Sequence, residues 1–252
     1  GLPPDGVLEV SRVLGNGMAA LAGAVGDLVR DALIQPGDSE LDIAMRLAGA
    51  AEELAPQLDP LIAYVARRLR LEHARQLVVS AAELGAAATH TVVCFADLVG
   101  FTRLGEELPP EELGDVARRL VELAEAAAQP PVTLVKAIGD AVMLVSPEAD
   151  PMIDAALTLV ELAEAEGDDF PELRAGIAAG EALRRAGDWY GAPVNVASRV
   201  TGRARRGSVL VTEPVREAAR RPWKWSDAGR KRLRGISEEV QVWRVRRPPA
   251  EA

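Results

Sequence analysis

The stretch from Asp188 to Arg199, DWYGAPVNVASR, combines an acid, an amide and a guanidinium around an abrupt turn. Gly191 and Pro193 interrupt the chain there, and we expect a helix to begin at Asn195. Asn195 and Arg199 are four residues apart, so a helix places both side chains on one face. Each residue alone also fits a capped helix with a solvated arginine, and the other motifs must decide between these interpretations.

Two aspartates lie where we expect neighbouring strands to end. Asp97 follows an apolar run in HTVVCFADL, and Asp140 lies in the tight turn AIGD. Taken singly, Asp97 fits the N-cap of a helix in GFTRLGEEL, and Asp140 fits ordinary turn chemistry. Together at neighbouring strand ends, the two carboxylates form an oxygen-rich site for hard cations such as Mg²⁺. Two such ions about 3.5–4 Å apart are the usual clamp for in-line phosphoryl chemistry.

The second half of the chain alternates short apolar runs with amphipathic helical patterns. The expected strands are residues 90–98, two strands within 131–146, a strand with a short hairpin in 172–191, 208–212 and 239–246. The expected helices are residues 109–128 and 149–167, a helix from Asn195, and a short helix after residue 212. Gly139 joins two of the strands in a turn where it can adopt positive φ. This order predicts an α+β, ferredoxin-like (split βαβ) fold with additional strands.

The first half has a different pattern, because up to about residue 86 its apolar residues follow helical spacing only. Asp38 or Ser39 is expected to cap one helix, and a long amphipathic helix is expected from about Leu61 to Leu84. We therefore divide the chain into a helical N-terminal regulatory or dimerisation domain, residues 1–86, and a second domain, residues 87–252, that carries the polar motifs. The chain begins with Gly1 rather than Met, which suggests a fragment of a longer protein.

Composition argues against several classes of function. Of the 252 residues, 48% are hydrophobic and 27% charged, and 29 basic against 38 acidic residues give a net charge of −9. An acidic chain is a poor generic ligand for nucleic acid or anionic lipid. The basic runs 203–206 and 230–234 could still face a small polyanion, with solvated surface as the alternative. No stretch reaches about 18 consecutive apolar residues, so we expect a soluble cytoplasmic protein without a membrane span.

Cysteine and histidine are too rare for several kinds of site. Cys94 is the only cysteine, which excludes an intrachain disulfide and a cysteine-rich metal centre. It lies within the apolar run TVVCFA, so we expect a buried thiol rather than a nucleophile. The two histidines, His73 and His90, are too few and too scattered for a zinc site.

Four ordered stretches resemble the signatures of the class III nucleotidyl cyclase catalytic domain. They are FADLVGFT, KAIGDAVM, GDWYGAPVNVASR, and GRKRLRGI followed by VQVWRV. The resemblance covers about residues 88–247. One motif such as GFT would be weak, but four motifs in the right order at plausible spacing are specific. The resemblance implies a ferredoxin-like core and a head-to-tail dimer with active sites at its interface.

The resemblance also implies roles for the matching positions, including the binding of two divalent cations, Mg²⁺ or Mn²⁺. These positions are the metal ligands Asp97 and Asp140, the purine-reading pair Lys136 and Asp188, the ribose-orienting Asn195 and the transition-state residue Arg199. Arg234 or Lys231 is a candidate contact for the outer phosphates, although solvated charge is the alternative for both.

The hydrogen-bonding chemistry of Lys136 and Asp188 favours adenine. Adenine offers an acceptor at N1 and a donor at its amine, which suit a donor-only lysine and an acceptor-only aspartate. Guanine presents the opposite pattern, and each mismatch would cost about 1–3 kcal/mol. We therefore expect ATP as the substrate, with attack of the ribose 3′-oxygen on the α-phosphorus giving cyclic AMP and pyrophosphate. Arg199 would stabilise the charge that develops on the α-phosphoryl group.

Lys136 and Asp140 flank one tight hairpin, so we do not expect both to serve the same nucleotide from one chain. The family arrangement resolves this conflict. Each site takes its metals from one subunit and its base, ribose and transition-state contacts from the other. A chain that carries all six matching residues therefore implies a homodimer with two equivalent sites.

Three alternatives stay open at this point. In the first, the second domain is a catalytically silent nucleotide-sensing module. In the second, it is a guanylate cyclase. In the third, the cyclase activity is secondary to a helical first half that binds a partner protein or lipid. Turnover of ATP, turnover of GTP and deletion of residues 1–86 separate these alternatives. Within the leading hypothesis, the first half either regulates the dimer or is a passive dimerisation module.

Overall fold

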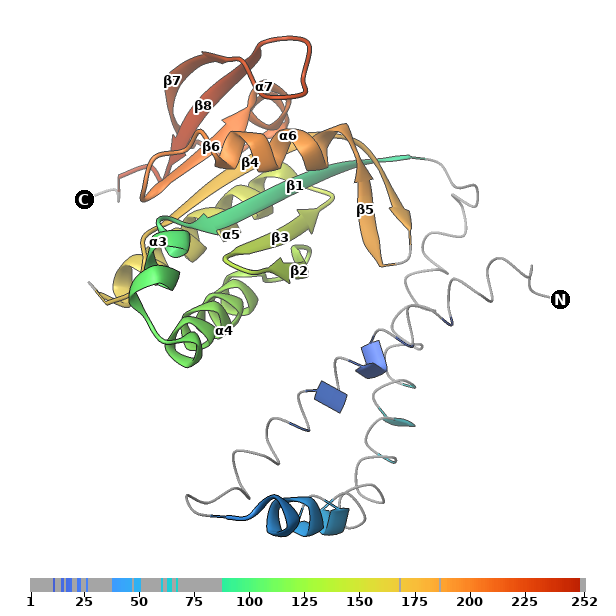
Figure 1. The fold of residues 1–252 in the computed structure, drawn as a ribbon. Helices are drawn as coiled ribbons and strands as arrows, with labels where there is room; N and C mark the ends of the chain where they lie inside the picture. Colours follow the sequence, from blue (N-terminus) through green and yellow to red (C-terminus); the bar gives the residue numbers. More distant parts are fainter. Residues whose placement is uncertain are drawn as a thin grey trace, which may run out of the picture. The chain divides into compact units, whose positions relative to one another are not determined.

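The computed structural model describes residues 88–167, 169–185 and 187–249 of the second half. In the first half it describes residues 38–46 and 48–50, with the scattered positions 11, 15, 17–19, 22–23, 26, 60, 63–64 and 67. Contacts between Cα atoms divide the chain into two compact units, Gly1–Ala87 and Ala88–Ala252 (Figure 1).

In the first unit, the described residues 40–46 are helical. Of the two expected caps, Ser39 forms the cap: the backbone N–H of Asp42 donates to Ser39 Oγ at 3.3 Å, and Ser39 Oγ donates to Asp42 Oδ2 at 2.5 Å. Asp38 instead accepts two hydrogen bonds from Arg46, at 2.9 and 2.8 Å. Most of the helix expected between residues 61 and 84, including His73, lies outside the described residues.

The second unit alternates strands and helices. In chain order these are β1 (Thr89–Leu98), α3 (Phe101–Glu107), α4 (Pro110–Ala127), β2 (Thr133–Ile138), β3 (Ala141–Ser146), α5 (Ala149–Ala165), β4 (Leu173–Arg185), β5 (Asp188–Gly191), α6 (Ala192–Thr201), β6 (Ser208–Thr212), α7 (Glu213–Ala218), β7 (Lys224–Lys231) and β8 (Val240–Arg246). The β2–β3 turn contains Gly139 at φ 59°, as its sequence predicts.

The strands form one sheet in the order β2-β3-β1-β4-β6-β8-β7, with β5 paired to β4. Antiparallel pairing joins β2 to β3, β3 to β1 and β1 to β4. With α4 and α5 as the crossovers, these four strands make the split βαβ core, so the predicted ferredoxin-like α+β class is confirmed. The remaining strands extend the sheet through a parallel pairing of β4 with β6.

Two local expectations were wrong. Helix α6 begins at Ala192 rather than at Asn195, because Pro193 occupies its first turn, where the missing N–H costs no hydrogen bond. Strand β7 was not expected, because KWSDAGRK lacks apolar alternation. It is an edge strand with a register shift between Asp227 and Arg230, and polar residues are tolerated there.

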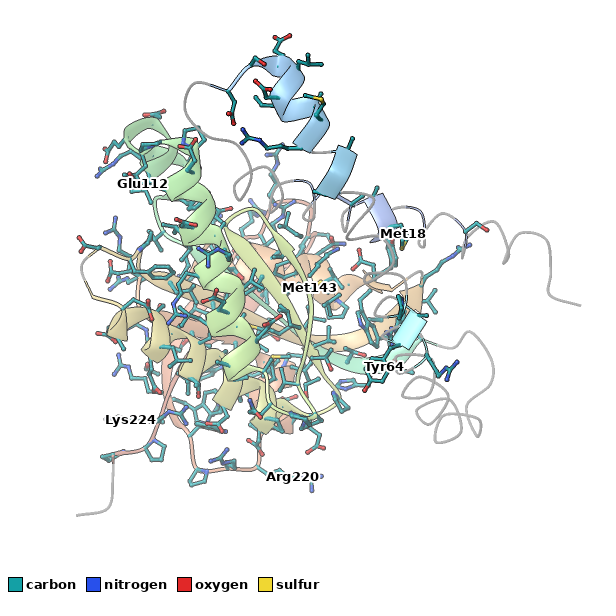
Figure 2. The ribbon with its side chains drawn as sticks, turned by 90° about the horizontal axis from the view of Figure 1, so that it is seen from below. Met18, Tyr64, Glu112, Met143, Arg220 and Lys224 are labelled. Carbon is teal, nitrogen blue, oxygen red and sulfur yellow. The ribbon has the colours of Figure 1, made fainter. Side chains whose placement is uncertain are left out.

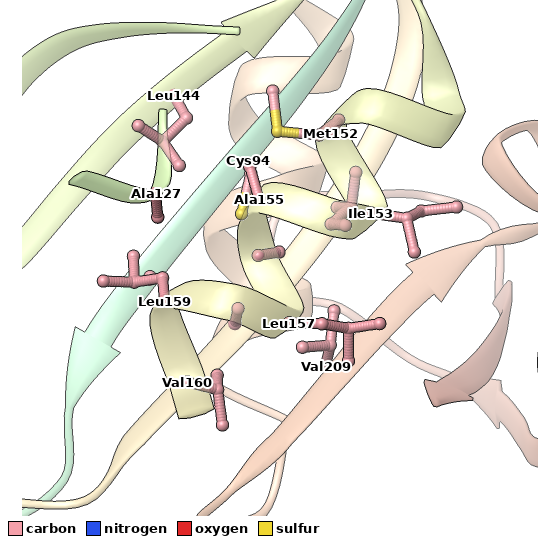
Figure 3. Close-up of a cluster of buried hydrophobic side chains, with 14 of the residues drawn as sticks. Cys94, Ala127, Leu144, Met152, Ile153, Ala155, Leu157, Leu159, Val160 and Val209 are labelled. Atoms are coloured by element: carbon pink, nitrogen blue, oxygen red, sulfur yellow. The ribbon is translucent and has the colours of Figure 1, made fainter. Parts of the chain in front are cut away.

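Helices α4 and α5 pack on one face of the sheet and bury the main core (Figures 1 and 3). Met152 and Leu159 of α5 lie against the β1 and β3 side chains, and all are fully buried. Cys94 is part of this cluster, and burial raises the pKa of its thiol to about 12. The expected buried, unreactive cysteine is therefore confirmed.

Helix α6 packs on the opposite face, over β4 and β1 (Figure 1). Its close approach depends on Gly176 of β4, where an added Cβ would lie 2.3 Å from the backbone nitrogen of Thr201. The hydroxyl of Thr201 donates to the carbonyl of Phe95 in β1 at 3.1 Å. These contacts hold α6, and with it Asn195 and Arg199, against the central strands.

The surface of the second unit is rich in charged side chains. Glu112 on α4 and Arg220 and Lys224 near β7 are examples (Figure 2). Among the described residues, no helix combines the length and apolar character that crossing a membrane requires.

Candidate active site

The two aspartates of the proposed metal site lie at adjacent strand ends. Val93 and Phe95 of β1 face the α6 side of the sheet, so Asp97, two residues further on, faces the same side. The backbone N–H of Leu98 donates to the carbonyl of Asp140 at 3.0 Å, which holds the β2–β3 turn beside the end of β1. The structure thus brings the two expected acids together.

The electrostatics of this pair favour a cation. Burial raises the pKa of Asp140, and the negative charge of Asp97 raises it further, whereas a backbone hydrogen bond and Arg174 act in the opposite direction. Within the described residues, no group of three or more His, Cys, Asp or Glu side chains is arranged to hold a metal. Two carboxylates suffice for Mg²⁺ when substrate phosphates and water complete its shell, so the donor set fits.

Arg174 is a site residue that the sequence did not reveal. It lies directly opposite Asp97 in the β1–β4 register, and its Nε and Nη2 donate to Asp97 Oδ2 at 2.9 and 2.5 Å. Asp97 therefore does not cap α3, whose N-cap is Gly100 at φ 84°. The sequence feature that could have pointed to Arg174 is its single charge near the start of the otherwise apolar run LRAGIAA.

Lys136 of β2 and Asp188 of β5, the proposed purine-reading pair, contact one another. Lys136 Nζ donates to Asp188 Oδ2, and the backbone N–H of Trp189 donates to Asp188 Oδ1 at 2.8 Å. Burial raises the pKa of Asp188, but these two hydrogen bonds outweigh it and hold the pKa below its usual value. Both side chains are about one third exposed, at 35% and 29%, so a ligand can reach them.

Asn195 and Arg199 lie on the outward face of α6. Both are exposed, whereas Ala197 and Val200 of the same helix are buried against the sheet. In the described part of the chain, no ion pair engages Arg199. Its guanidinium is therefore available to an anion.

These groups form two separate sets of contacts: Asp97 and Asp140 beside Arg174, and Lys136 with Asp188. Asp97 and Asp188 lie beside different ends of β4. Asp97 lies opposite Arg174 at the first end of the strand, whereas Asp188 lies opposite Arg185 at the last residue. β4 is 13 residues long, and the β4–β5 hairpin continues from its far end. Lys136 of β2 is in register with Gly176 near the first end of β4, so its contact with Asp188 requires the β4–β5 hairpin to approach β2.

The two basic residues proposed for the outer phosphates lie apart from the acids in the described contacts. Lys231 is the last residue of β7 and lines a cavity with Arg203, Arg205 and Arg244. Arg234 is exposed in the connection between β7 and β8. No hydrogen bond within the described ranges joins either residue to Asp97 or Asp140.

Solved structures define the class of fold. The catalytic core of a rhodopsin-guanylyl cyclase with converted specificity, in complex with ATPαS, superposes with a TM-score of 0.58 at 21% identity. It covers 64% of this chain and 97% of that one. The adenylyl cyclase CyaB from P. aeruginosa gives a TM-score of 0.54 at 24% identity, covering 65% and 96% of the two chains. The second unit therefore has the fold of a nucleotide cyclase catalytic domain.

Sequence comparison identifies the family. Residues 86–246 match the adenylate and guanylate cyclase catalytic domain, and residues 1–75 match the adenylate cyclase regulatory domain. The chain belongs to the adenylate and guanylate cyclase family, as its four motifs predicted. Catalytic domains of this family use divalent metal ions, bind nucleotide substrates and act as dimers.

Curated relatives extend over both units. A pH-sensitive adenylate cyclase of Mycobacterium tuberculosis is 46% identical over 258 residues, covering 98% of this chain and 64% of the relative. An adenylate cyclase of Streptomyces griseus is 34% identical over 205 residues, covering 81% of this chain and 51% of the relative. The chain thus spans between half and two thirds of the length of these relatives.

Proposed function

We propose that this chain is an adenylate cyclase that converts ATP to cyclic AMP and pyrophosphate at sites shared between two copies. The observation that carries the proposal is that its functional groups form two separate sets of contacts. Asp97 and Asp140 lie beside Arg174, whereas Lys136 contacts Asp188, and no hydrogen bond among the described residues joins the two sets. Two chains packed head to tail would bring one half-site of each type together.

Exposed apolar side chains lie on the strands that carry Lys136 and Asp188. Ile138 and Tyr190 are 52% and 55% exposed, and each lies on a strand that also carries a member of the base-reading pair. α4 and α5 cover the other face of the sheet, which leaves the α6 face for the partner. The dimer would therefore bury apolar surface beside the residues that bind substrate.

Base selection would come from Lys136 and Asp188. When ATP enters, Lys136 would donate to adenine N1 and Asp188 would accept from the exocyclic amine. Each side chain exchanges one hydrogen bond of the ion pair for one to the base. Guanine would instead place a donor against Lys136 and an acceptor against Asp188, so neither hydrogen bond could form. This difference favours ATP over GTP.

Asp97 and Asp140 would hold two divalent cations, Mg²⁺ or Mn²⁺, together with the triphosphate oxygens. These ions supply Lewis-acid chemistry that lowers the pKa of the ribose 3′-hydroxyl and anchors the triphosphate. Arg174 would then turn from Asp97 toward the phosphates, since its guanidinium suits a phosphate as well as a carboxylate.

Asn195 and Arg199 would come from the other subunit. Asn195 would orient the ribose so that its 3′-oxygen faces the α-phosphorus. Arg199 would stabilise the charge that builds on the α-phosphoryl oxygens, and loss of such a contact commonly costs 10²-fold or more in rate. A site for nucleotide sensing alone would not require this exposed guanidinium, which no acid of the described residues engages.

The decisive experiment mixes two inactive variants. Asp97→Ala and Arg199→Ala should each fail to form cyclic AMP, because each breaks both equivalent sites. A mixture should regain activity, since half of the possible dimers are mixed and each mixed dimer has one intact site. Failure of the mixture, with both proteins folded and dimeric, would reject the shared-site arrangement. A wild type that makes no cyclic AMP under Mn²⁺ would instead favour a silent sensor, and faster turnover of GTP would favour a guanylate cyclase.

We also propose that residues 1–86 regulate the dimer and that residues 87–252 carry catalysis. The match of residues 1–75 to an adenylate cyclase regulatory domain supports this division. Deletion of residues 1–86 should change the specific activity of the remaining chain. Unchanged activity and unchanged dimerisation would leave the first half free for another task.

A further inference from the structure

A cavity of 330 Å³ lies at the C-terminal end of α6, and among its lining residues only Lys231 and Arg244 belong to the four motifs of the sequence. Its charged lining consists of four cations and one acid: Arg203, Arg205, Lys231, Arg244 and Asp227. The remaining lining comes from Leu210, Ser226 and Ala228. The cavity is therefore strongly basic in a chain whose net charge is −9.

Strand register explains how the cavity is built. Leu210 of β6 pairs with Arg244 of β8, and Arg244 pairs in turn with Ser226 of β7. Residues directly opposite one another project on the same face of a sheet, so these three form one row. Leu210 packs in the cluster that contains Val200 of α6, so the row faces α6. Arg244 stands between a buried leucine and a hydroxyl donor.

The cations of the cavity have no acidic partner in the described part of the chain. Several other arginines there do contact acids: Arg119 binds Glu166 at 2.8 Å, and Arg247 binds Glu161 at 2.8 Å. The single lining acid, Asp227, is engaged by its own hairpin, because its Oδ1 accepts from the backbone N–H of Gly229 and from Gln241, each at 2.7 Å.

The dipole of α6 accounts for only part of this arrangement. Arg203 and Arg205 follow the last turn of α6 and interact favourably with the negative end of its dipole. Lys231 and Arg244 come from other strands and gain nothing from that dipole. Four like charges that converge on one cavity repel one another, and an anion would relieve that repulsion.

The lining selects among anions. Three guanidinium groups and a hydroxyl suit phosphate oxygens, which arginine binds in pairs. No aromatic side chain is present in the lining to stack on a nucleobase. The number of cations suits a condensed phosphate with several negative charges better than a single orthophosphate.

We propose that this cavity is a binding site for inorganic condensed phosphate of the pyrophosphate class, separate from the catalytic centre and independent of metal ions. The choice of pyrophosphate rests on the proposed function, which releases that anion, whereas the cation set stands independently of it. An anion bound here would contact Arg203, which lies two residues beyond the end of the helix that carries Arg199.

The test measures pyrophosphate binding to the full chain by calorimetry, in excess EDTA and without ATP. The wild type should bind, and Arg205→Gln/Arg244→Gln should weaken binding by about tenfold or more, because two charge-assisted contacts are lost. Arg230→Gln/Arg246→Gln is the matched control: it removes two exposed arginines of β7 and β8 that do not line the cavity. This control and Arg199→Gln should bind as the wild type does.

Three results would overturn the proposal: no binding to the wild type, equal weakening in the control, or loss of binding only in Arg199→Gln. The single charge reversal Arg205→Glu, in an exposed loop, provides a second variant if the double variant unfolds, and it should also weaken binding. Because no turnover is measured, a chain that makes no cyclic AMP but binds pyrophosphate here would reject only the proposed function.

Discussion

Lys136 and Asp188 form an ion pair although 52 residues separate them in the sequence. The pair joins edge strand β2 to the β4–β5 hairpin, and both side chains stay about one third exposed. An exposed ion pair contributes little to stability, so a ligand can replace it at little cost to the fold. In our proposal, adenine replaces the ion pair with two hydrogen bonds of matching polarity.

Replacing Lys136 with Met should relax the choice of base. The variant keeps most of the length of the side chain but loses the donor to adenine N1, so the ratio of kcat/KM for ATP over GTP should fall about 10–100-fold. Initial rates with the two nucleotides measure the ratio. Lys224→Met, an exposed lysine of β7, should leave it unchanged. An unaltered ratio in Lys136→Met would exclude this lysine from base selection.

Replacing Arg174 with Met should tighten Mn²⁺ binding in the absence of nucleotide. The guanidinium of Arg174 occupies Asp97 Oδ2 and repels a cation, so its removal should raise affinity about tenfold. Turnover should nevertheless fall, because a phosphate contact is lost. Calorimetric titration of Mn²⁺ measures the first effect, with Asp97→Ala as a control that should abolish binding. Weaker Mn²⁺ binding in Arg174→Met would show that the ion pair instead organises the site.

Replacing Gly176 with Ala should destabilise the docking of α6. The new methyl group would lie 2.3 Å from the backbone nitrogen of Thr201, so the helix must shift, at a cost of about 3 kcal/mol. Cyclic AMP formation should fall as well, because α6 carries Arg199. Gly114→Ala in α4 is the matched control. No atom lies within 4 Å of its added Cβ, so it should gain about 0.5–1 kcal/mol. Urea unfolding measures both, and equal stability of the two variants would refute the packing argument.

Replacing Asp150 with Ala should destabilise the connection before β7. Asp150 accepts from the indole N–H of buried Trp223 at 2.7 Å and from the backbone N–H groups of Arg220 and Arg221. Loss of this acceptor leaves those donors unpaired, so the free energy of unfolding should fall by about 2–3 kcal/mol at neutral pH. Glu148→Ala, an exposed neighbour, should change it little.

The effect of Asp150 should depend on pH. Burial raises its pKa, but the three hydrogen bonds outweigh burial and hold the pKa below its ordinary value of 3.8. A lowered folded-state pKa stabilises the protein above about pH 4, and the contribution is lost as pH falls through the folded value. The difference in unfolding free energy between wild type and Asp150→Ala should therefore shrink as the pH falls below the ordinary aspartate value of 3.8. A difference that grows in acid would contradict the assigned shift.

Much of the fold follows from local patterns in the sequence. Strands 90–98 and 208–212 and the helix within 149–167 follow from apolar periodicity, and Gly139 marks the turn between β2 and β3. β7 was missed because an edge strand needs no apolar alternation. The start of α6 was misplaced because proline both interrupts strands and begins helices.

The sequence by itself determined which chemical groups are present and the order of the elements that carry them, because motifs and periodicities are local. Only the tertiary structure decided which groups meet. Arg174 contacts Asp97 across 77 residues, and Lys136 reaches Asp188 through a hairpin at the far end of β4. Strand register creates such neighbours, and it depends on pairings between segments far apart in the chain. The row of Leu210, Arg244 and Ser226 that lines the basic cavity arises in the same way.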